Sequence, residues 1–296
     1  MSESKYISLL SDLGFKKVFG KENSSEEFLI DFLNELFKDD PDLSNIVSVR
    51  YKNNEKSPNH SEDKEVFYDL FCETDTGHRF IVEMQKQTHK YFADRVTYYM
   101  CREISEQLAD YKNRNNNDYR LLPVVGVFIT NFTVSGMENK PVVHGKFLDP
   151  ESGKVVLDKL KCAFVQLSQF NKTPEECVTG FDKWMYILKN MENLQEIPFK
   201  TYKNQLFQRL GELSKVTNLS GEERRQYERD LRWVRDYNAV MQYAIEEGQE
   251  KGRAEGRAEG QQLKAKEIAG NMKKSGMSIE DIAALTGLPV SDIELL

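Results

Sequence analysis

A predicted β-hairpin brings two carboxylates close together. Residues 66–74 and residues 79–85 are rich in β-branched and aromatic side chains, and the turn sequence Asp-Thr-Gly at 75–77 separates them. With these three residues as the loop, and with the glycine in its positive-φ position, Asp69 lies directly opposite Glu83. Like charges in such a pair destabilise a sheet unless something compensates them.

The face that carries this pair is otherwise apolar. Gln85 projects from the same side as Glu83, because side chains alternate along a strand, and Phe71 and Ile81 share this side. Burying unpaired charges is costly, and a raised pKa or a bound cation relieves that cost. A hard divalent ion, Mg²⁺ or Mn²⁺, takes carboxylate oxygens, waters and a backbone carbonyl, which Met84 is placed to supply. Such an ion lowers the pKa of a bound water and offsets charge on a phosphodiester.

A simpler alternative places the same residues on an exposed edge of the sheet. Asp69 would then face solvent, and Glu83 would pair with Lys86 or Arg79. Acidic residues at this spacing also occur by chance. The pattern alone therefore leaves the metal site and the exposed edge both open.

The elements that must position the hairpin begin with two helices. Apolar residues recur at helical intervals up to Gly20, which ends the first helix. A second helix with a broad apolar face is predicted to start near Ser24, because Ser24 followed by Glu27 fits a capping box. Residues 44–52 alternate as a strand does, and the polar residues 53–64 are typical of a loop.

A mixed sheet with helices around it is the predicted architecture. Residues 91–112 favour a long helix, and residues 121–129 are an apolar run that suits a strand buried on both faces. Further strands are expected at 142–148 and 162–167. The rest of the pattern is helical, over about residues 174–192, 199–215 and 221–262. The fold class is therefore α/β, followed by a helical C-terminal region.

The predicted division of the chain has four parts. They are a core, a helical region, a glycine-spaced charged segment and a small tail, at residues 1–172, 173–245, 246–264 and 265–296. In the third part, glycine recurs at every fourth position from 248 to 260, between charged side chains. This indicates either a helix face kept bare for close approach, which would suit a homodimer, or a flexible charged linker.

The tail has the spacing of a helix–turn–helix. Ser278 is expected to cap a short helix, Gly287 to end it and Ser291 to cap another, with Leu285 in a small apolar core. A helix that reads bases would carry basic and amide side chains, whereas the second helix here is acidic. The tail therefore favours interaction or packing over base readout, which counts against a transcription regulator.

Composition narrows the class of protein. The formal net charge of −7 argues against a protein that coats nucleic acid, but not against an enzyme that touches DNA through a local patch and a metal. No apolar run approaches the length of a membrane span, and the N-terminus lacks a secretion signal, so a cytoplasmic protein is expected. The four cysteines lie far apart and no histidine pair has zinc spacing, which predicts reduced thiols.

Several sequence blocks occur in an order that resembles one family. The blocks are DLGFKKVFG at 12–20, YDL at 68–70, FIVEMQK at 80–86 and FADRVTYY at 92–99. They resemble the recombination-promoting nucleases, also described as transposases, of the PD-(D/E)XK nuclease superfamily, over about residues 8–190. The resemblance implies a restriction-endonuclease-like core, a mixed sheet flanked by helices, and Mg²⁺-dependent cleavage of DNA.

The resemblance also implies roles for individual residues. Asp69 matches the first metal-binding acid, Glu83 matches the acid of the third block, and Gln85 stands where most of the superfamily has lysine. Glu-x-Gln matches this transposase-like branch, and glutamine can orient a water but carries no charge. The cationic role would then pass to Lys86 or Arg95.

Four further residues are candidates for the site. Arg95 could contact the scissile phosphate or hold Glu83, or it could form a surface ion pair with Asp94. Asp12 belongs to the first block and could equally cap a helix. Glu35 and Asp31 flank the apolar face of the second helix, where superfamily members often carry an extra acid.

An arginine cluster also lies in the C-terminal helical region. It could form a phosphate-contacting stripe, or pair within the helix with the acids interleaved among its members. Its members are Arg224, Arg225, Arg229, Arg232 and Arg235.

These observations favour a metal-dependent DNA endonuclease associated with transposition or recombination. Asp69 and Glu83 would hold the metal, and Gln85 would orient the water that attacks the phosphodiester. The alternative is a catalytically degenerate nuclease fold that acts as a DNA- or protein-binding assembly module.

Overall fold

The protein consists of two compact units. A computed structural model describes residues 4–20, 25–53, 55–56, 66–88, 90–109, 119–203 and 205–296. The first unit is Met1–Leu231 and the second is Arg232–Leu296. The finer four-part division expected from the sequence stays a prediction.

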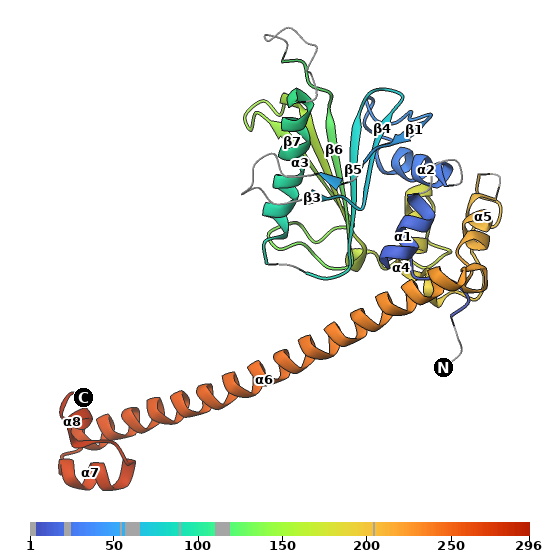
Figure 1. Ribbon diagram of the computed structural model, residues 1–296. Coiled ribbons are helices and arrows are strands. Elements are labelled where there is room, and N and C mark those ends of the chain that lie inside the picture. Colours follow the sequence, from blue (N-terminus) through green and yellow to red (C-terminus); the bar gives the residue numbers. More distant parts are fainter. Residues whose placement is uncertain are drawn as a thin grey trace. The chain divides into compact units, whose positions relative to one another are not determined.

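A mixed sheet of six strands forms the centre of the first unit (Figure 1). Its order is β1-β4-β5-β6-β8-β7. Pairing is antiparallel from β1 to β5, parallel between β5, β6 and β8, and antiparallel between β8 and β7. The bounds are β1 Val49–Tyr51, β4 Leu70–Thr74, β5 Arg79–Gln85, β6 Val124–Thr130, β7 Val142–Leu148 and β8 Val155–Gln166. The predicted mixed sheet is confirmed.

The acidic hairpin has the predicted register. Leu70 pairs with Val82 in an antiparallel ladder, which sets Asp69 level with Glu83. Gly77 has φ +81°, so the loop uses the left-handed conformation that glycine adopts without strain. The first strand is interrupted, however: β3 covers Val66–Phe67 and β4 starts at Leu70.

Helices cover both faces of the sheet (Figure 1). One face packs against α1 Asp12–Phe19, α2 Glu26–Leu36, α4 Gly180–Asn190 and α5 Leu206–Leu213. The other face is covered by α3 Phe92–Ala109. Three short 3-10 helices lie at Leu167–Gln169, Met191–Asn193 and Val216–Asn218.

An aromatic cluster joins the helices of the first face. The ring of Trp184, fully buried, lies 5.7 Å from Phe19, 5.8 Å from Phe32 and 5.0 Å from Phe207, measured between ring centroids. Such contacts contribute beyond simple burial of area. Because Trp184 belongs to α4 and Phe207 to α5, both helices belong to the same core as the sheet.

Several element boundaries differ from the predictions. Helix α2 is capped at Ser25 and begins at Glu26, while Ser24 lies outside the described residues. The strand expected at 44–52 is only β1, because residues 41–45 form turns. Residues 53–64 were expected to form a loop, and this prediction is wrong for Glu55–Lys56. These two residues form β2, which pairs with β3 in a small second sheet. The rest of that stretch, 54 and 57–64, lies outside the described residues.

The later elements were predicted in order but not in length. Strand β8 starts seven residues earlier than expected, at Val155, because it forms a long hairpin with β7. Helix α4 starts only at Gly180, where Thr179 and Asp182 form a reciprocal capping box. Helix α5 starts at Leu206, after three non-glycine residues with positive φ: Phe199, Lys203 and Gln205.

The second unit is helical. Helix α6, Gly221–Lys274, continues through all four spaced glycines, so the linker interpretation is wrong. Ser278 caps α7, Ile279–Thr286, and Gly287 ends it with φ +71°, as predicted. The Ser291 cap is wrong, since α8, Val290–Glu294, is preceded by Pro289.

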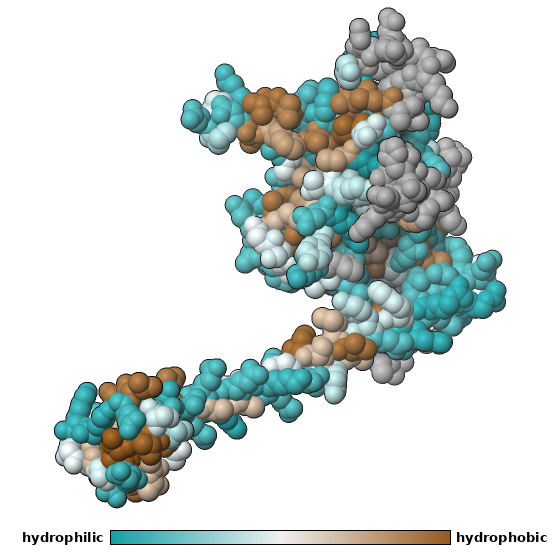
Figure 2. Space-filling model, turned by 60° about the vertical axis from the view of Figure 1, so that its left-hand side comes forward, coloured by the Kyte–Doolittle hydropathy of each residue, from teal (hydrophilic) through white to brown (hydrophobic). Residues whose placement is uncertain are grey.

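The small core of the second unit comprises Ala269, Ile282, Leu288 and Ile293. Leu285, expected in that core, is 66% exposed and was predicted wrongly. Apolar side chains gather on the surface of this unit, while the glycine-spaced part of α6 is mostly hydrophilic (Figure 2). None of the described helices is long and apolar enough to cross a membrane.

Candidate active site

The break between β3 and β4 lies at the acidic pair, where backbone amides bond to the carboxylates of Asp69 and Glu83. The backbone amide of Asp69 donates to Glu83 Oε1 at 3.0 Å, and the amide of Met84 donates to Asp69 Oδ2 at 2.8 Å. The strand is interrupted at Asp69 because its amide bonds a side chain in place of a ladder carbonyl. Each carboxylate thus receives one backbone hydrogen bond from the opposite strand.

Burial makes both acids hard to ionise. Glu83 is 6% exposed, and burial, followed by the negative charge of Asp69, raises its pKa to about 8. Burial also raises the pKa of Asp69, against the effect of the Met84 amide. Without a cation, the pair therefore holds a proton at neutral pH.

An arginine from α3 fixes the third residue of this face. Arg95 Nη2 donates to Gln85 Oε1. The Arg95 guanidinium lies 5.5 Å from the ring centroid of Phe92 and 5.8 Å from that of Tyr99, and both rings can stabilise a cation. Since the Gln85 oxygen is engaged by Arg95, its amide nitrogen remains as the group that can donate to another partner.

Helix α1 contributes two charges to the surroundings of the pair. Lys16 and Asp12 form an ion pair at 2.8 Å on this helix. After burial and the Met84 bond, the negative charge of Asp12 further raises the pKa of Asp69, whereas Lys16 lowers it. Ser11, not Asp12, caps the helix, because its hydroxyl accepts from the Gly14 amide at 3.0 Å.

Lys16 was not singled out from the sequence. Its positive charge acts on Glu83 as well as on Asp69. The available signal was its place four residues after Asp12 in the first sequence block, which puts both side chains on one face of a helix.

The Met84 carbonyl faces the gap beside Asp69. In a strand, the N–H and C=O of one residue point to the same neighbour, and the side alternates along the chain. The Met84 amide points to Asp69, and the Gln85 carbonyl accepts from the Asn131 amide at 3.2 Å on the opposite side. The carbonyl of Met84 therefore lies on the side of Asp69, beyond the end of β4.

The donor set suits a hard divalent ion. It offers two carboxylates and one backbone carbonyl, all oxygen, which Mg²⁺ and Mn²⁺ prefer over nitrogen or sulfur. In the described part of the chain, no three His, Cys, Asp or Glu side chains lie close enough to share a metal. Waters or substrate oxygens would therefore complete the coordination of an ion held here, as is usual for Mg²⁺.

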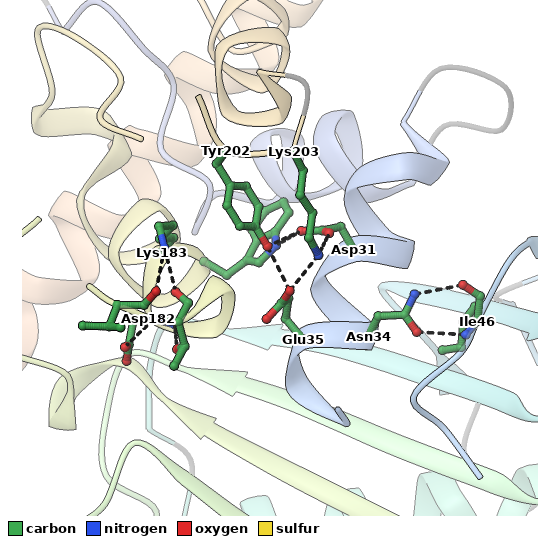
Figure 3. A network of polar contacts seen from close by, with 11 residues as sticks. Asp31, Asn34, Glu35, Ile46, Asp182, Lys183, Tyr202 and Lys203 are labelled. Atoms are coloured by element: carbon green, nitrogen blue, oxygen red, sulfur yellow. Dashed lines mark hydrogen bonds and ion pairs between the residues drawn. The ribbon is translucent and has the colours of Figure 1, made fainter. Parts of the chain in front are cut away.

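Glu35 and Asp31 belong to a different network (Figure 3). Lys203 Nζ contacts Asp31 at 2.5 Å and Glu35 at 2.6 Å. The Tyr202 hydroxyl donates to Glu35 at 3.0 Å, and Trp184 Nε1 donates to Asp31 at 2.8 Å. These bonds tie α2 to α4 and to the segment before α5, and they do not bring Glu35 or Asp31 to the Asp69–Glu83 pair.

The remaining cationic candidates lie in two places. Lys86 directly follows β5 and is partly buried. In α6, Arg224 pairs with Glu228 at 3.5 Å, as the intrahelical interpretation expects, whereas Arg229 donates to the neutral side chain of Gln226.

Comparison with known proteins gave one family. A family model described as "PD-(D/E)XK nuclease family transposase" matches residues 9–244. The match therefore includes every residue of the site described above. Neither the curated proteins nor the solved structures gave a match.

Proposed function

Because the chain belongs to the PD-(D/E)XK nuclease family transposases, we propose that it is a metal-dependent DNA endonuclease acting at the Asp69–Glu83 pair. The observation that carries this proposal is the carboxyl pair at the break in the hairpin, in which Glu83 is buried and Asp69 is half-buried. Two acids that both resist ionisation destabilise a fold by themselves, and a divalent cation between them removes that cost.

Asp69, Glu83 and the Met84 carbonyl would hold Mg²⁺ or Mn²⁺. When bound, such an ion lowers the pKa of a coordinated water and offsets the charge that develops on the phosphodiester. The protein's own part is to orient both carboxylates, while the charge of the bound ion would keep them ionised. The backbone bonds to Asp69 and Glu83 fix that orientation.

Gln85 and Arg95 together replace the lysine of other superfamily members. Arg95 holds the Gln85 oxygen, so that the Gln85 amide nitrogen is the donor presented to a water or to a phosphate oxygen. The positive charge comes from the guanidinium itself, with Lys16 or Lys86 as further cations near the site. Of these three cations, Arg95 is the best candidate to supply the positive charge, because it contacts Gln85 directly.

DNA is the proposed substrate, and hydrolysis of its phosphodiester bonds is the proposed reaction. The formal net charge of −7 requires that the DNA be held through local contacts and the metal. Cytoplasmic location, a role in transposition or recombination, and a homodimer also belong to the proposal. The sequence suggested the glycine-spaced part of α6 as one place for the dimer contact. The contrary possibility is a degenerate nuclease fold that only binds.

Cleavage of supercoiled plasmid tests the proposal. The wild type should nick or linearise DNA in Mg²⁺ or Mn²⁺ and not in EDTA. Asp69→Asn should lower the rate by at least about 100-fold, the usual scale for loss of an essential electrostatic group. Asp75→Asn is the matched control, because Asp75 lies in the loop of the same hairpin and its carboxylate accepts hydrogen bonds from the amides of Val47 and Ser48.

Two results would contradict the proposal. Cleavage by Asp69→Asn at the wild-type rate would show that Asp69 is not part of the active site. A wild type that binds DNA but cleaves it with none of these metals would favour the binding module.

A further inference from the structure

The outer edge of β7 is unpaired within the described residues. Strand β7 is the last strand of the six-stranded sheet, and no described segment pairs with its second side. It runs unbroken over Val142–Leu148, because the extra residues of the irregular pairing lie on β8. Such an edge is a template for another strand, and proteins commonly protect it with lysine, proline or a bulge in the edge strand itself. Strand β7 has no proline or bulge, and the charge of its one lysine, Lys146, is paired with Asp40 of the same copy.

The direction of each backbone group on this edge follows from one hydrogen bond. The Pro141 carbonyl accepts from the Gln166 amide of β8 at 2.8 Å, so residue 141 faces β8. Since direction alternates along a strand, the N–H and C=O groups of every second residue face outward. These outward residues are Val142, His144, Lys146 and Leu148.

The order of apolar and polar side chains along β7 is symmetric about Gly145. The sequence is Val-Val-His-Gly-Lys-Phe-Leu, which is apolar, apolar, polar, glycine, polar, apolar, apolar. Phe147 is 49% exposed and Leu148 is 47% exposed, an unusual degree for large apolar side chains on adjacent residues. The strand is therefore self-complementary about Gly145.

We propose that β7 pairs antiparallel with β7 of a second copy of this chain, centred on Gly145. Val142 then lies opposite Leu148 of the second copy, and Val143 opposite Phe147 of the second copy. His144 lies opposite Lys146 of the second copy, and the two Gly145 residues face each other. The two sheets become continuous through an interface with two-fold symmetry.

Hydrogen-bond direction and polarity exclude the neighbouring registers. A shift of one residue would set outward-facing groups against inward-facing ones, which cannot bond. A shift of two residues in one direction places Lys146 opposite Lys146 of the second copy. The opposite shift places Val142 opposite Lys146 of the second copy.

The polar pair in the proposed register is compatible with close approach. Burial, followed by the positive charge of Lys146, lowers the pKa of His144, which favours the neutral imidazole. Lys146 retains its own counter-ion, with Nζ 2.9 Å from Asp40 of the same copy. No like-charge contact arises between the two copies.

Sedimentation measurements of the oligomeric state test whether the edge of β7 forms a dimer. The wild type should be a dimer at micromolar concentration, and Leu148→Glu should weaken the dimer by at least about 100-fold, because a carboxylate would face Val142. Val156→Glu is the matched control, since Val156 is 59% exposed on β8 of the same hairpin and off the β7 edge. A monomeric wild type, a dimer that survives Leu148→Glu, or equal dissociation by Val156→Glu would each overturn the proposal.

Cross-linking tests the register. In a Cys101→Ala background, which removes the one exposed cysteine among the described residues, His144→Cys and Lys146→Cys are made separately. Opposite residues of a hydrogen-bonded pair lie about 5.5 Å apart between Cα atoms, within reach of a disulfide. The two variants should cross-link only when mixed. A disulfide that forms in either variant alone would show a different register and overturn the proposal.

Discussion

Removing the charge of Glu83 should change how stability depends on pH. The pKa of Glu83 is raised to about 8 by burial and by Asp69, from an ordinary value of 4.5. Between these two values the folded protein binds a proton that the unfolded chain has lost. Without metal, the wild type should therefore lose stability as the pH rises from about 4.5 to about 8. Glu83→Gln, which keeps an oxygen for the Asp69 amide, should lack the part of this loss that Glu83 causes.

The expected size follows from the shift. One pKa unit corresponds to about 1.4 kcal/mol, so the change from about pH 5 to about pH 8 amounts to on the order of 4 kcal/mol. Asp69 adds in the same direction, because its pKa is also raised. A bound divalent cation should abolish the loss, and at about 100 times its Kd it adds about 2.7 kcal/mol.

Urea unfolding at a series of pH values measures this effect. Wild type and Glu83→Gln should have similar free energies of unfolding at pH 5 in EDTA, and the variant should be the more stable at pH 8. Glu35→Gln is the control. Burial by itself would raise the pKa of Glu35, but the contact with Lys203 outweighs burial and lowers this pKa below its ordinary value of 4.5. The contribution of Glu35 to the free energy of unfolding therefore changes only below about pH 4.5. A difference between wild type and Glu83→Gln that stays constant from pH 5 to pH 8 would refute the reasoning.

Four other substitutions separate the site from its surroundings. Arg95→Met should lower the cleavage rate about 100-fold, because the guanidinium holds Gln85 and its charge also lowers the pKa of Asp69 and Glu83; unchanged cleavage would show that Arg95 takes no part in the reaction. Gln85→Lys should reduce cleavage, since it sets a like charge against Arg95; a faster enzyme would show that the usual lysine is simply missing. Glu35→Gln should cleave at the wild-type rate, and a large loss would place Glu35 in the chemistry. Ser278→Ala should destabilise the second unit by about 1 kcal/mol in thermal unfolding, through loss of the α7 cap, and an unchanged transition would contradict the cap.

The register of the acidic hairpin could be predicted because local rules determine it. A loop with glycine at position 77 fixes which residues pair, and Asp69 then falls opposite Glu83. The break in the strand at Asp69 could not be predicted, since it depends on where two side chains accept backbone hydrogen bonds.

Long-range partners explain the other differences. Polar residues flanking the apolar face of α2 looked equivalent in the sequence, but Glu35 contacts Lys203, which is 168 residues away. Nothing near Glu35 in the sequence announces that partner. Lys16 reaches the surroundings of Asp69 for the same kind of reason, through the packing of α1 beside the sheet.

The C-terminal helix α6 shows that the low helix propensity of single glycines does not decide the structure of a segment. Four glycines left helix and linker both open in the sequence, because each glycine costs about 1 kcal/mol against alanine. The intervening Glu, Lys, Arg and Ala residues favour helix, and α6 continues through the segment. Local capping rules succeeded at Ser278 and failed at Ser291, where Pro289 precedes the helix.

A crystal structure with Mn²⁺ would show whether Asp69 and Glu83 hold the metal ion. Anomalous scattering locates the ion independently of any assumption about the site. We expect a peak about 2.1 Å from oxygens of Asp69 and Glu83 and from the Met84 carbonyl. A Mn²⁺ ion bound elsewhere in a protein that cleaves DNA, with Asp69 and Glu83 still bonded only to each other's strand, would contradict this expectation.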